Sequence, residues 1–206
     1  MDTRLARTQH AYDAGAAAYQ EHWRARRPLD AIRKFAARAG RNARVIDVAA
    51  GPALDLRLLR DAGLSVVAGD LSAESMKMAG TLFPKGALAR WDYRRLPFGD
   101  KVFDGVWASQ ALQHVPRAQV RAVLTEWRRV QRGGPIFVSL REGSGDLEEV
   151  DEPPVGAVHA TSVTADELRA LLLWAGYGEV EVEPRPDLLG RSDVTWLHGF
   201  GTLPPA

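Results

Sequence analysis

Three aspartates and one histidine are the side chains of this chain best suited to chemistry. Asp47 and Asp70 each end a short stretch rich in β-branched residues, and Gly51 lies nineteen residues before Asp70. A carboxylate placed in this way can accept hydrogen bonds from ribose hydroxyls, and small residues let a ligand approach backbone amides at the start of a helix. Asp92 follows a third expected strand at residues 87–91, and His114 could remove a proton from a nucleophile, because an imidazole has an ordinary pKa near 6.5. The spacing therefore predicts a nucleotide-like ligand held by acids, with a candidate base further along the chain.

The residues around these acids predict a strand, a turn of small residues and a helix. Residues 44–48 and 65–70 are expected to be buried strands, because the first holds three β-branched residues and the second a pair of valines. Between them, residues 47–51 are mostly small, Pro52 suits the first turn of a helix, and leucines at positions 54–59 supply an apolar helix face. Open α/β sheets bind ligands beyond the carboxyl ends of their strands, so the turn and both acids should lie beside the ligand.

The rest of the chain alternates between helix and strand patterns. Helices are expected at residues 3–26, 29–39, 73–83, 117–130 and 165–175, and strands at 87–91, 104–108, 136–140, 177–182 and 193–200. The loop 109–116 leaves the fourth strand and should lie beside the reacting group. Residues 141–160 are rich in glycine, proline and acids, and we expect a long loop there, either without structure or folded as a flap over the substrate.

Several of these segments resemble the motifs of class I S-adenosylmethionine-dependent methyltransferases. The stretch R-V-I-D-V-A-A-G-P-A at 44–53 resembles the family's glycine-rich first motif, and G-D-L-S at 69–72 resembles its second. L-P-F-G-D-K-V-F-D at 96–104 resembles the widespread L-P-F-x-D-x-x-F-D signature, which is long and specific. A leader with Tyr12 and Tyr19 on one helix face is also similar to the helix that covers the cofactor in many family members.

The resemblance implies a Rossmann-like, doubly wound α/β fold. Its seven-stranded sheet is mostly parallel with an antiparallel last strand, helices cover both faces, and a single domain spans 1–206. Within that domain, residues 1–42 are expected to form a helical lid and residues 43–206 the core.

The resemblance also implies roles for individual residues. S-adenosylmethionine would be bound by Tyr12, Tyr19, Asp47, Ala49, Gly51, Asp70, Leu71, Asp92, Tyr93, Ser109 and Gln110. In this assignment Asp70 accepts from the ribose hydroxyls, Asp92 accepts from the adenine amine, and Asp47 accepts from turn amides or from the cofactor's amino group. His114 is the candidate catalytic base, although a histidine hydrogen-bonded within its loop is the plainer interpretation.

The first motif departs from the family at Ala49 and Ala53, which stand where two of its glycines are usual. If the backbone at Ala49 needs a positive φ, alanine costs about 1 kcal/mol there and its methyl group crowds the ligand. A negative φ would make the alanine harmless. Alanine at the third small position of such turns is tolerated, so Ala53 is expected to matter less.

Composition limits the other classes of function. The chain has 206 residues, a formal net charge of +1 and no cysteine, so disulfides and thiolate metal sites are excluded. Residues 1–44 are basic and residues 142–187 acidic, which fits two solvated faces or a basic surface for an anionic substrate. We expect a cytoplasmic monomer or homodimer with a small-molecule substrate, no metal site, no membrane segment and no nucleic-acid partner.

Three alternatives stay open at this point. A degenerate methyltransferase fold could act as a binding module without catalysis, and the altered glycines are its only support. An RNA-directed methyltransferase is compatible with the basic leader, but no RNA-reading motif is present. An NAD-dependent oxidoreductase would need G-x-G-x-x-G, which the first turn lacks.

Overall fold

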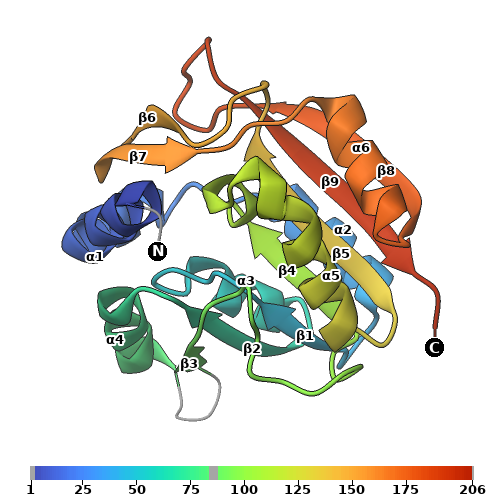
Figure 1. The fold of residues 1–206 in the computed structure, drawn as a ribbon. Coiled ribbons are helices and arrows are strands. Elements are labelled where there is room, and N and C mark those ends of the chain that lie inside the picture. The colour runs from blue at the N-terminus through green and yellow to red at the C-terminus, as the bar shows by residue number, and fades with distance from the viewer. Residues whose placement is uncertain (1–2, 84–87, 206) are drawn as a thin grey trace.

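The computed structural model describes residues 3–83 and 88–205, and its centre is a seven-stranded sheet (Figure 1). The strands are β1 (Arg44–Asp47), β2 (Ser65–Asp70), β3 (Leu88–Arg90), β4 (Gly105–Ser109), β5 (Gly134–Arg141), β8 (Gly178–Pro186) and β9 (Thr195–Leu203). They lie in the order β3-β2-β1-β4-β5-β9-β8, and β9 runs antiparallel to both of its neighbours. The other pairs from β3 to β5 are parallel, which confirms the predicted mostly parallel sheet with an antiparallel last strand.

Helices cover both faces of this sheet, and each face has its own apolar core. On one face pack α2 (Leu29–Ala39), α3 (Leu54–Asp61) and α4 (Ala73–Leu82); on the other pack α5 (Val120–Val130) and α6 (Ala165–Trp174). Figure 1 shows α5 and α6 in front of the sheet and α2 behind it. Side chains of alternate strand residues point to opposite faces, so Trp107 packs against Phe35 of α2 while Val106 packs toward α5 and α6.

The N-terminal helix α1 (Thr3–Trp23) lies outside these two layers. Of the predicted lid region 1–42, α1 alone covers the ends of the strands, because α2 packs into the core with Phe35 fully buried. The Asp13 carboxylate of α1 accepts a hydrogen bond of 2.6 Å from the Ser72 hydroxyl, just before α4.

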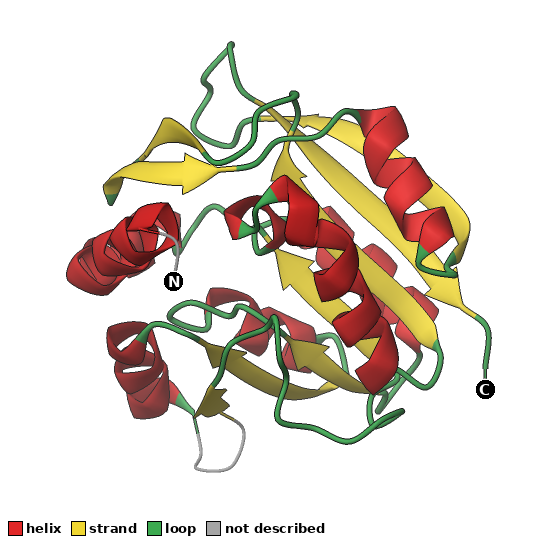
Figure 2. Ribbon diagram, in the orientation of Figure 1, coloured by secondary structure: helices red, strands yellow, loops and turns green. Residues whose placement is uncertain are grey.

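The expectation of a long loop at 141–160 is wrong for most of that segment. Residues 148–152 and 156–160 form the hairpin of β6 (Glu148–Glu152) and β7 (Gly156–Ala160), drawn as yellow arrows beside α1 in Figure 2. The Thr8 hydroxyl accepts from the His159 amide at 2.9 Å, and the Trp23 indole donates to the Pro153 carbonyl at 3.2 Å. A Cβ at Gly15 would lie 2.7 Å from Val155, so helix and hairpin pack closely.

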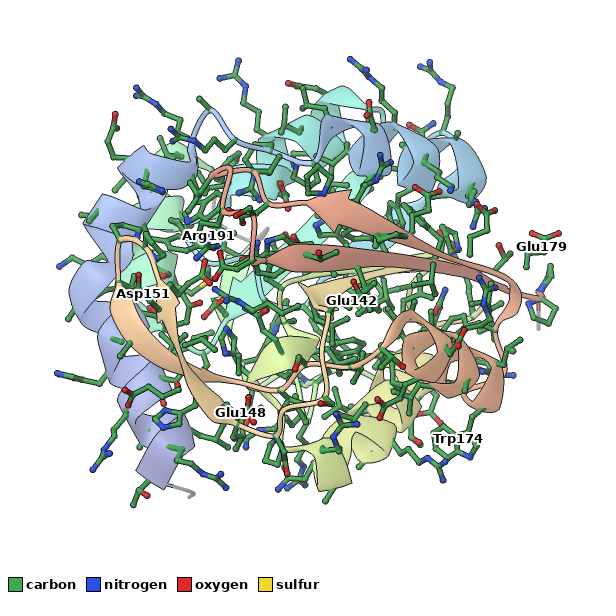
Figure 3. All side chains as sticks on the ribbon, turned by 90° about the horizontal axis from the view of Figure 1, so that it is seen from above. Glu142, Glu148, Asp151, Trp174, Glu179 and Arg191 are labelled. Carbon is green, nitrogen blue, oxygen red and sulfur yellow. The ribbon has the colours of Figure 1, made fainter. Side chains whose placement is uncertain are left out.

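Seen from above, the hairpin runs along α1, with Glu148 and Asp151 marking its two ends (Figure 3). Arg191, from the loop before β9, donates to the Asp151 carbonyl at 3.2 Å. Trp174 and Glu179 lie at the opposite end of the molecule in this view. The hairpin therefore holds α1 in place over one end of the sheet.

Two smaller expectations also need correction. Helix α3 begins at Leu54, so Pro52 lies inside the preceding turn and not in the first turn of the helix. The helix expected at 117–130 begins with a short 3-10 turn at Arg117–Gln119, and α5 proper starts at Val120. Residue 87 of the third expected strand and the segment 84–86 lie outside the described residues.

Candidate active site

A hollow lies at the carboxyl ends of β1, β2 and β4, beneath α1. It encloses about 960 Å³ of space including its mouth, and we call it the main hollow. Its walls include eleven of the twelve residues predicted from the sequence: Tyr12, Tyr19, Ala49, Gly51, Asp70, Leu71, Asp92, Tyr93, Ser109, Gln110 and His114. The structure thus brings together residues that lie up to 102 positions apart in the chain.

Asp70 and Gly51 meet in the wall of the main hollow. One carboxylate oxygen of Asp70 accepts from the Gly51 amide and the other from the Ser72 amide, both at 2.8 Å. Burial raises the pKa of Asp70, although these amides oppose the effect. Gly51 has a φ of 53°, and a Cβ there would meet no atom within 4 Å, so the open space above it is free for a ligand.

The strain in this turn lies at Ala53 and not at Ala49. Ala49 lacks a positive φ, so its alanine is harmless there, whereas Ala53 has a left-handed φ of 61° and is buried. Alanine in this conformation costs about 1 kcal/mol. The expectation that Ala53 matters less than Ala49 is therefore wrong for the backbone, but the methyl group of Ala53 packs in the core, away from the main hollow.

Asp47 is the one predicted residue that does not line the main hollow. Its side chain is buried behind the turn, and its carboxylate accepts a hydrogen bond from the Ala49 amide. Burial, followed by the nearby Asp55 and Asp70, raises the pKa of Asp47 well above its ordinary value. This geometry fits the first of its two predicted roles, fixing the turn through an amide.

Asp92 carries a counter-ion that the sequence analysis did not anticipate. The Arg94 guanidinium contacts both oxygens of the Asp92 carboxylate, the shortest distance being 2.6 Å from Nη2. Burial alone would raise the pKa of Asp92, but the hydrogen bonds from Arg94 outweigh it and the pKa lies below its ordinary value. Asp92 is consequently an ionised acceptor at neutral pH, with Arg94 lining the main hollow beside it.

His114 is held at both ring nitrogens. Its Nδ1 lies 3.2 Å from the His159 carbonyl, which can only accept, so Nδ1 carries the proton in the neutral ring. Its Nε2 then accepts from the Tyr12 hydroxyl at 3.2 Å, with the Gln113 amide nitrogen at 3.3 Å. Burial lowers the pKa of His114 to about 4, although the His159 carbonyl opposes this and Arg141 adds to it.

Gln110 has an unusual backbone at the end of β4. Its φ is 56°, and its amide donates to the carbonyl and the hydroxyl of Ser139 on the neighbouring strand β5, at 3.0 and 2.9 Å. Its side-chain oxygen accepts from the Tyr19 hydroxyl of α1 at 3.3 Å. A second link between the covering helix and the strand ends is formed in this way.

Sequence reasoning missed several residues of the main hollow. These are Leu5, Thr8, Gln9 and Ala16 of α1, Pro52 of the turn, Ser72 and Ser75 at the start of α4, and Arg94 and Ala111. The α1 residues could have been found, because they continue the helical face of Tyr12 and Tyr19 at spacings of three and four. Within the described residues no cluster of metal-ligating side chains is found, and none of the described helices is long and apolar enough to cross a membrane.

Part of the chain matches a known family model. Residues 46–139 match the family model described as a methyltransferase domain, and this range holds the end of β1, all of β2 and β4, and most of the residues that line the main hollow. The match covers a little under half of the 206 residues, and the sheet order and the hollow at the strand ends agree with the resemblance to class I S-adenosylmethionine-dependent methyltransferases.

Particular relatives are found within that class. The chain is 28% identical over 176 residues to a malonyl-[acyl-carrier protein] O-methyltransferase of Pseudescherichia vulneris, covering 84% of this chain and 70% of the relative. It is also 43% identical over 108 residues to a demethylmenaquinone methyltransferase of Mycobacterium bovis. That match covers only 51% of this chain and 44% of the relative's length. A solved Burkholderia thailandensis 1,6-didemethyltoxoflavin-N1-methyltransferase, with its ligand and S-adenosylhomocysteine bound, shares the fold with a TM-score of 0.72 at 19% identity, covering 95% of this chain and 87% of that one.

Proposed function

We propose that this chain binds S-adenosylmethionine in the main hollow and transfers its methyl group to a small-molecule nucleophile beyond Ser109 and Gln110. The pairing of Asp70 with the Gly51 amide carries this proposal, because it sets a carboxylate beside the open space above the turn's one glycine. A pair of ribose hydroxyls fits this carboxylate, since each of its oxygens has a lone pair beyond the one used by an amide.

The remaining residues of the main hollow suit the other parts of the cofactor. Asp92 offers an ionised acceptor for the adenine amine, and Tyr93 supplies a fixed ring beside it because its hydroxyl donates to the Ala111 carbonyl at 3.1 Å. Tyr12 and Tyr19 of the covering helix α1 line the same hollow. When bound, the cofactor supplies an electrophilic methyl group on a sulfonium, so the chain mainly has to bind, orient and exclude water.

His114 is placed to act through orientation more than through proton transfer. With a pKa of about 4 it is unprotonated at neutral pH but a weak base, and its Nε2 is already occupied by the Tyr12 hydroxyl. We propose that His114 positions Tyr12 and the covering helix, and that the acceptor needs no strong base from this residue.

The names of the relatives favour a small-molecule acceptor over RNA. The malonyl-[acyl-carrier protein] and demethylmenaquinone enzymes are named for an oxygen methylation and for a quinone precursor, and the net charge of +1 gives no general attraction to nucleic acid. We further propose a monomer or homodimer in the cytoplasm, which light scattering and cell fractionation would test.

The deciding experiment is calorimetric titration of the chain with S-adenosylhomocysteine, followed by a mass-detected screen for methylated small molecules. We expect binding of one ligand per chain and the gain of one CH₂ unit by an acceptor. If the titration gives no heat and the ligand gives no thermal protection, the enzyme hypothesis is contradicted and a binding module of the same fold is favoured.

A further inference from the structure

A second hollow lies on the far side of Gln110 from the main hollow. It encloses about 1110 Å³ including its mouth, and Ser109 and Gln110 line both hollows. Its other walls come from the link between α1 and α2, from Ser139 at the end of β5, and from β8 and β9: Trp23, Arg26, Arg27, Pro28, Leu29, Asp30, Ala31, Arg33, Arg185, Pro186, Leu188, Trp196 and His198.

Neighbouring side chains of α1 line the two hollows. Tyr19 lines the main hollow and Trp23 the second, and their ring centroids are 6.1 Å apart. The Tyr19 hydroxyl donates to Gln110, whose left-handed backbone costs about 1 kcal/mol. Strained backbone of this kind is concentrated at functional sites, and Gln110 lines both hollows.

Two indoles that are fixed by hydrogen bonds line the second hollow. The Trp23 indole donates to the Pro153 carbonyl, and the Trp196 indole donates to the Asp187 carboxylate at 2.8 Å. Both side chains are almost fully buried, so their orientation is set before any ligand arrives. A planar ligand that packs against the exposed edges of these fixed rings costs them little conformational entropy.

The polar groups of the second hollow are mostly cationic. Four arginines line it against one acid, Asp30, which lies at the exposed rim. Arg185 contacts Glu183 at 3.0 Å through Nη2, but its Nε is buried and has no hydrogen-bond partner among the described residues. Arg27 donates hydrogen bonds through both Nε and Nη2 to the Asp55 carboxylate. The rest of the Arg185 side chain is accessible, since 40% of it is exposed, so its guanidinium can donate to an acceptor atom of a ligand in the second hollow.

The second hollow also lacks a base of ordinary strength. His198 is its only histidine, and burial, followed by the nearby Arg185, lowers the pKa of His198 to about 4. A nucleophile that already carries a negative oxygen needs no base. Such an oxygen forms one C–O bond while the C–S bond of a sulfonium breaks, the bonding pair stays on sulfur, and no proton is released.

We propose that the second hollow is the acceptor site and that it selects a planar anionic molecule, an aromatic carboxylate or a phenolate, held by Arg185 between Trp23 and Trp196. The inference rests on the proposed function, since it needs a methyl donor in the main hollow, and it adds the class of the acceptor and the residues that choose it.

The experiment uses the full chain saturated with S-adenosylhomocysteine and two probes of equal shape, 1-naphthoate and 1-naphthamide. Binding is measured by quenching of tryptophan fluorescence, because two tryptophans line the second hollow. We expect 1-naphthoate to bind at least tenfold more tightly than the neutral amide, without displacing S-adenosylhomocysteine. Arg185→Gln should weaken 1-naphthoate about tenfold and leave the amide and S-adenosylhomocysteine unchanged, as expected for one lost ionic hydrogen bond.

Arg169→Gln is the matched control, because Arg169 also contacts β8, through the Val180 carbonyl, but lines neither hollow. Equal binding of the two probes, displacement of S-adenosylhomocysteine by 1-naphthoate, or equal effects of the two arginine variants would each overturn the proposed acceptor site. Failure of S-adenosylhomocysteine itself to bind would instead contradict the proposed function, so the two failures are distinguishable.

Discussion

The Tyr12 hydroxyl lies 3.2 Å from Nε2 of His114 and joins the covering helix α1 to the loop that leaves β4. The same imidazole is tied through Nδ1 to the His159 carbonyl on the hairpin. Three segments that are distant in sequence therefore meet at one ring. A second hydrogen bond, from Tyr19 to Gln110, lies two helical turns further along α1. Together these contacts indicate that α1 and the strand ends form one binding site.

The first prediction concerns the protonation of His114. We expect the free protein to hold this ring neutral from pH 5.5 to pH 8, with the proton on Nδ1, because burial lowers its pKa to about 4 and the His159 carbonyl fixes the tautomer. Nitrogen-15 NMR of the imidazole distinguishes the two tautomers, and the His114→Gln variant identifies the signal. Titration with a midpoint near 6.5 would show that the ring is solvated and not held as described.

The second prediction concerns Asp70. We expect Asp70→Ala to weaken S-adenosylhomocysteine about 100-fold, because it removes two charge-assisted hydrogen bonds of about 1.5 kcal/mol each. Asp70→Asn keeps one acceptor oxygen and should have a smaller effect. Calorimetry measures both, and Asp61→Ala is the control, since Asp61 lies exposed on α3 opposite Arg57. Unchanged affinity in Asp70→Ala would contradict the proposal that the ribose hydroxyls bind at Asp70.

Much of the site was predictable because its residues lie in continuous motifs. Gly51, Asp70 and Asp92 each follow a recognisable strand, and the order of strands along the chain determines which ends meet. Backbone conformation was harder, since the sequence does not reveal which of two alanines, Ala49 or Ala53, adopts the left-handed conformation.

Features that depend on tertiary contacts could not be predicted. The hairpin strand β6 reads E-E-V-D-E, which has too few apolar residues to indicate a strand, and it is stabilised by pairing with β7 while β7 and its turn contact α1. The second hollow draws its walls from residues 23–33, 109–139 and 185–198, so no local pattern announces it. Because Arg94 lies two residues after Asp92, the ion pair between them could have been expected from the sequence. The position of Arg94 in the wall of the main hollow could not.

The third prediction compares two positions in the same turn. Gly51→Ala should lower the free energy of unfolding by about 1 kcal/mol, because the residue has a φ of 53°, and should also weaken S-adenosylhomocysteine, because the new methyl group would enter the main hollow. Ala53→Gly should leave stability nearly unchanged. It relieves about 1 kcal/mol of backbone strain but removes a buried methyl group worth about 0.8 kcal/mol.

Urea unfolding and calorimetry measure both effects in this pair. Ala53→Gly serves as the control for ligand binding, since its methyl group faces the core. A tolerated Gly51→Ala with full affinity would mean that no ligand approaches the backbone at this turn.

The fourth prediction concerns stability at mildly acidic pH and rests on His198. Its pKa is about 4 in the folded protein and near 6.5 in an unfolded chain, so between these values the unfolded state binds more protons. The contribution of His198 is therefore complete above pH 6.5 and is lost progressively as the pH falls toward 4. By this effect the wild type should lose about 1 to 2 kcal/mol of unfolding free energy between pH 7 and pH 5, and His198→Gln should lose correspondingly less.

Asp47 and Asp70, whose pKa values are raised by burial, act in the opposite direction, but they do so in both proteins and cancel in the comparison. Urea unfolding at the two pH values measures the difference. Identical pH dependence in the two proteins would show that His198 is solvated when folded, which would also weaken the picture of a second hollow without an effective base.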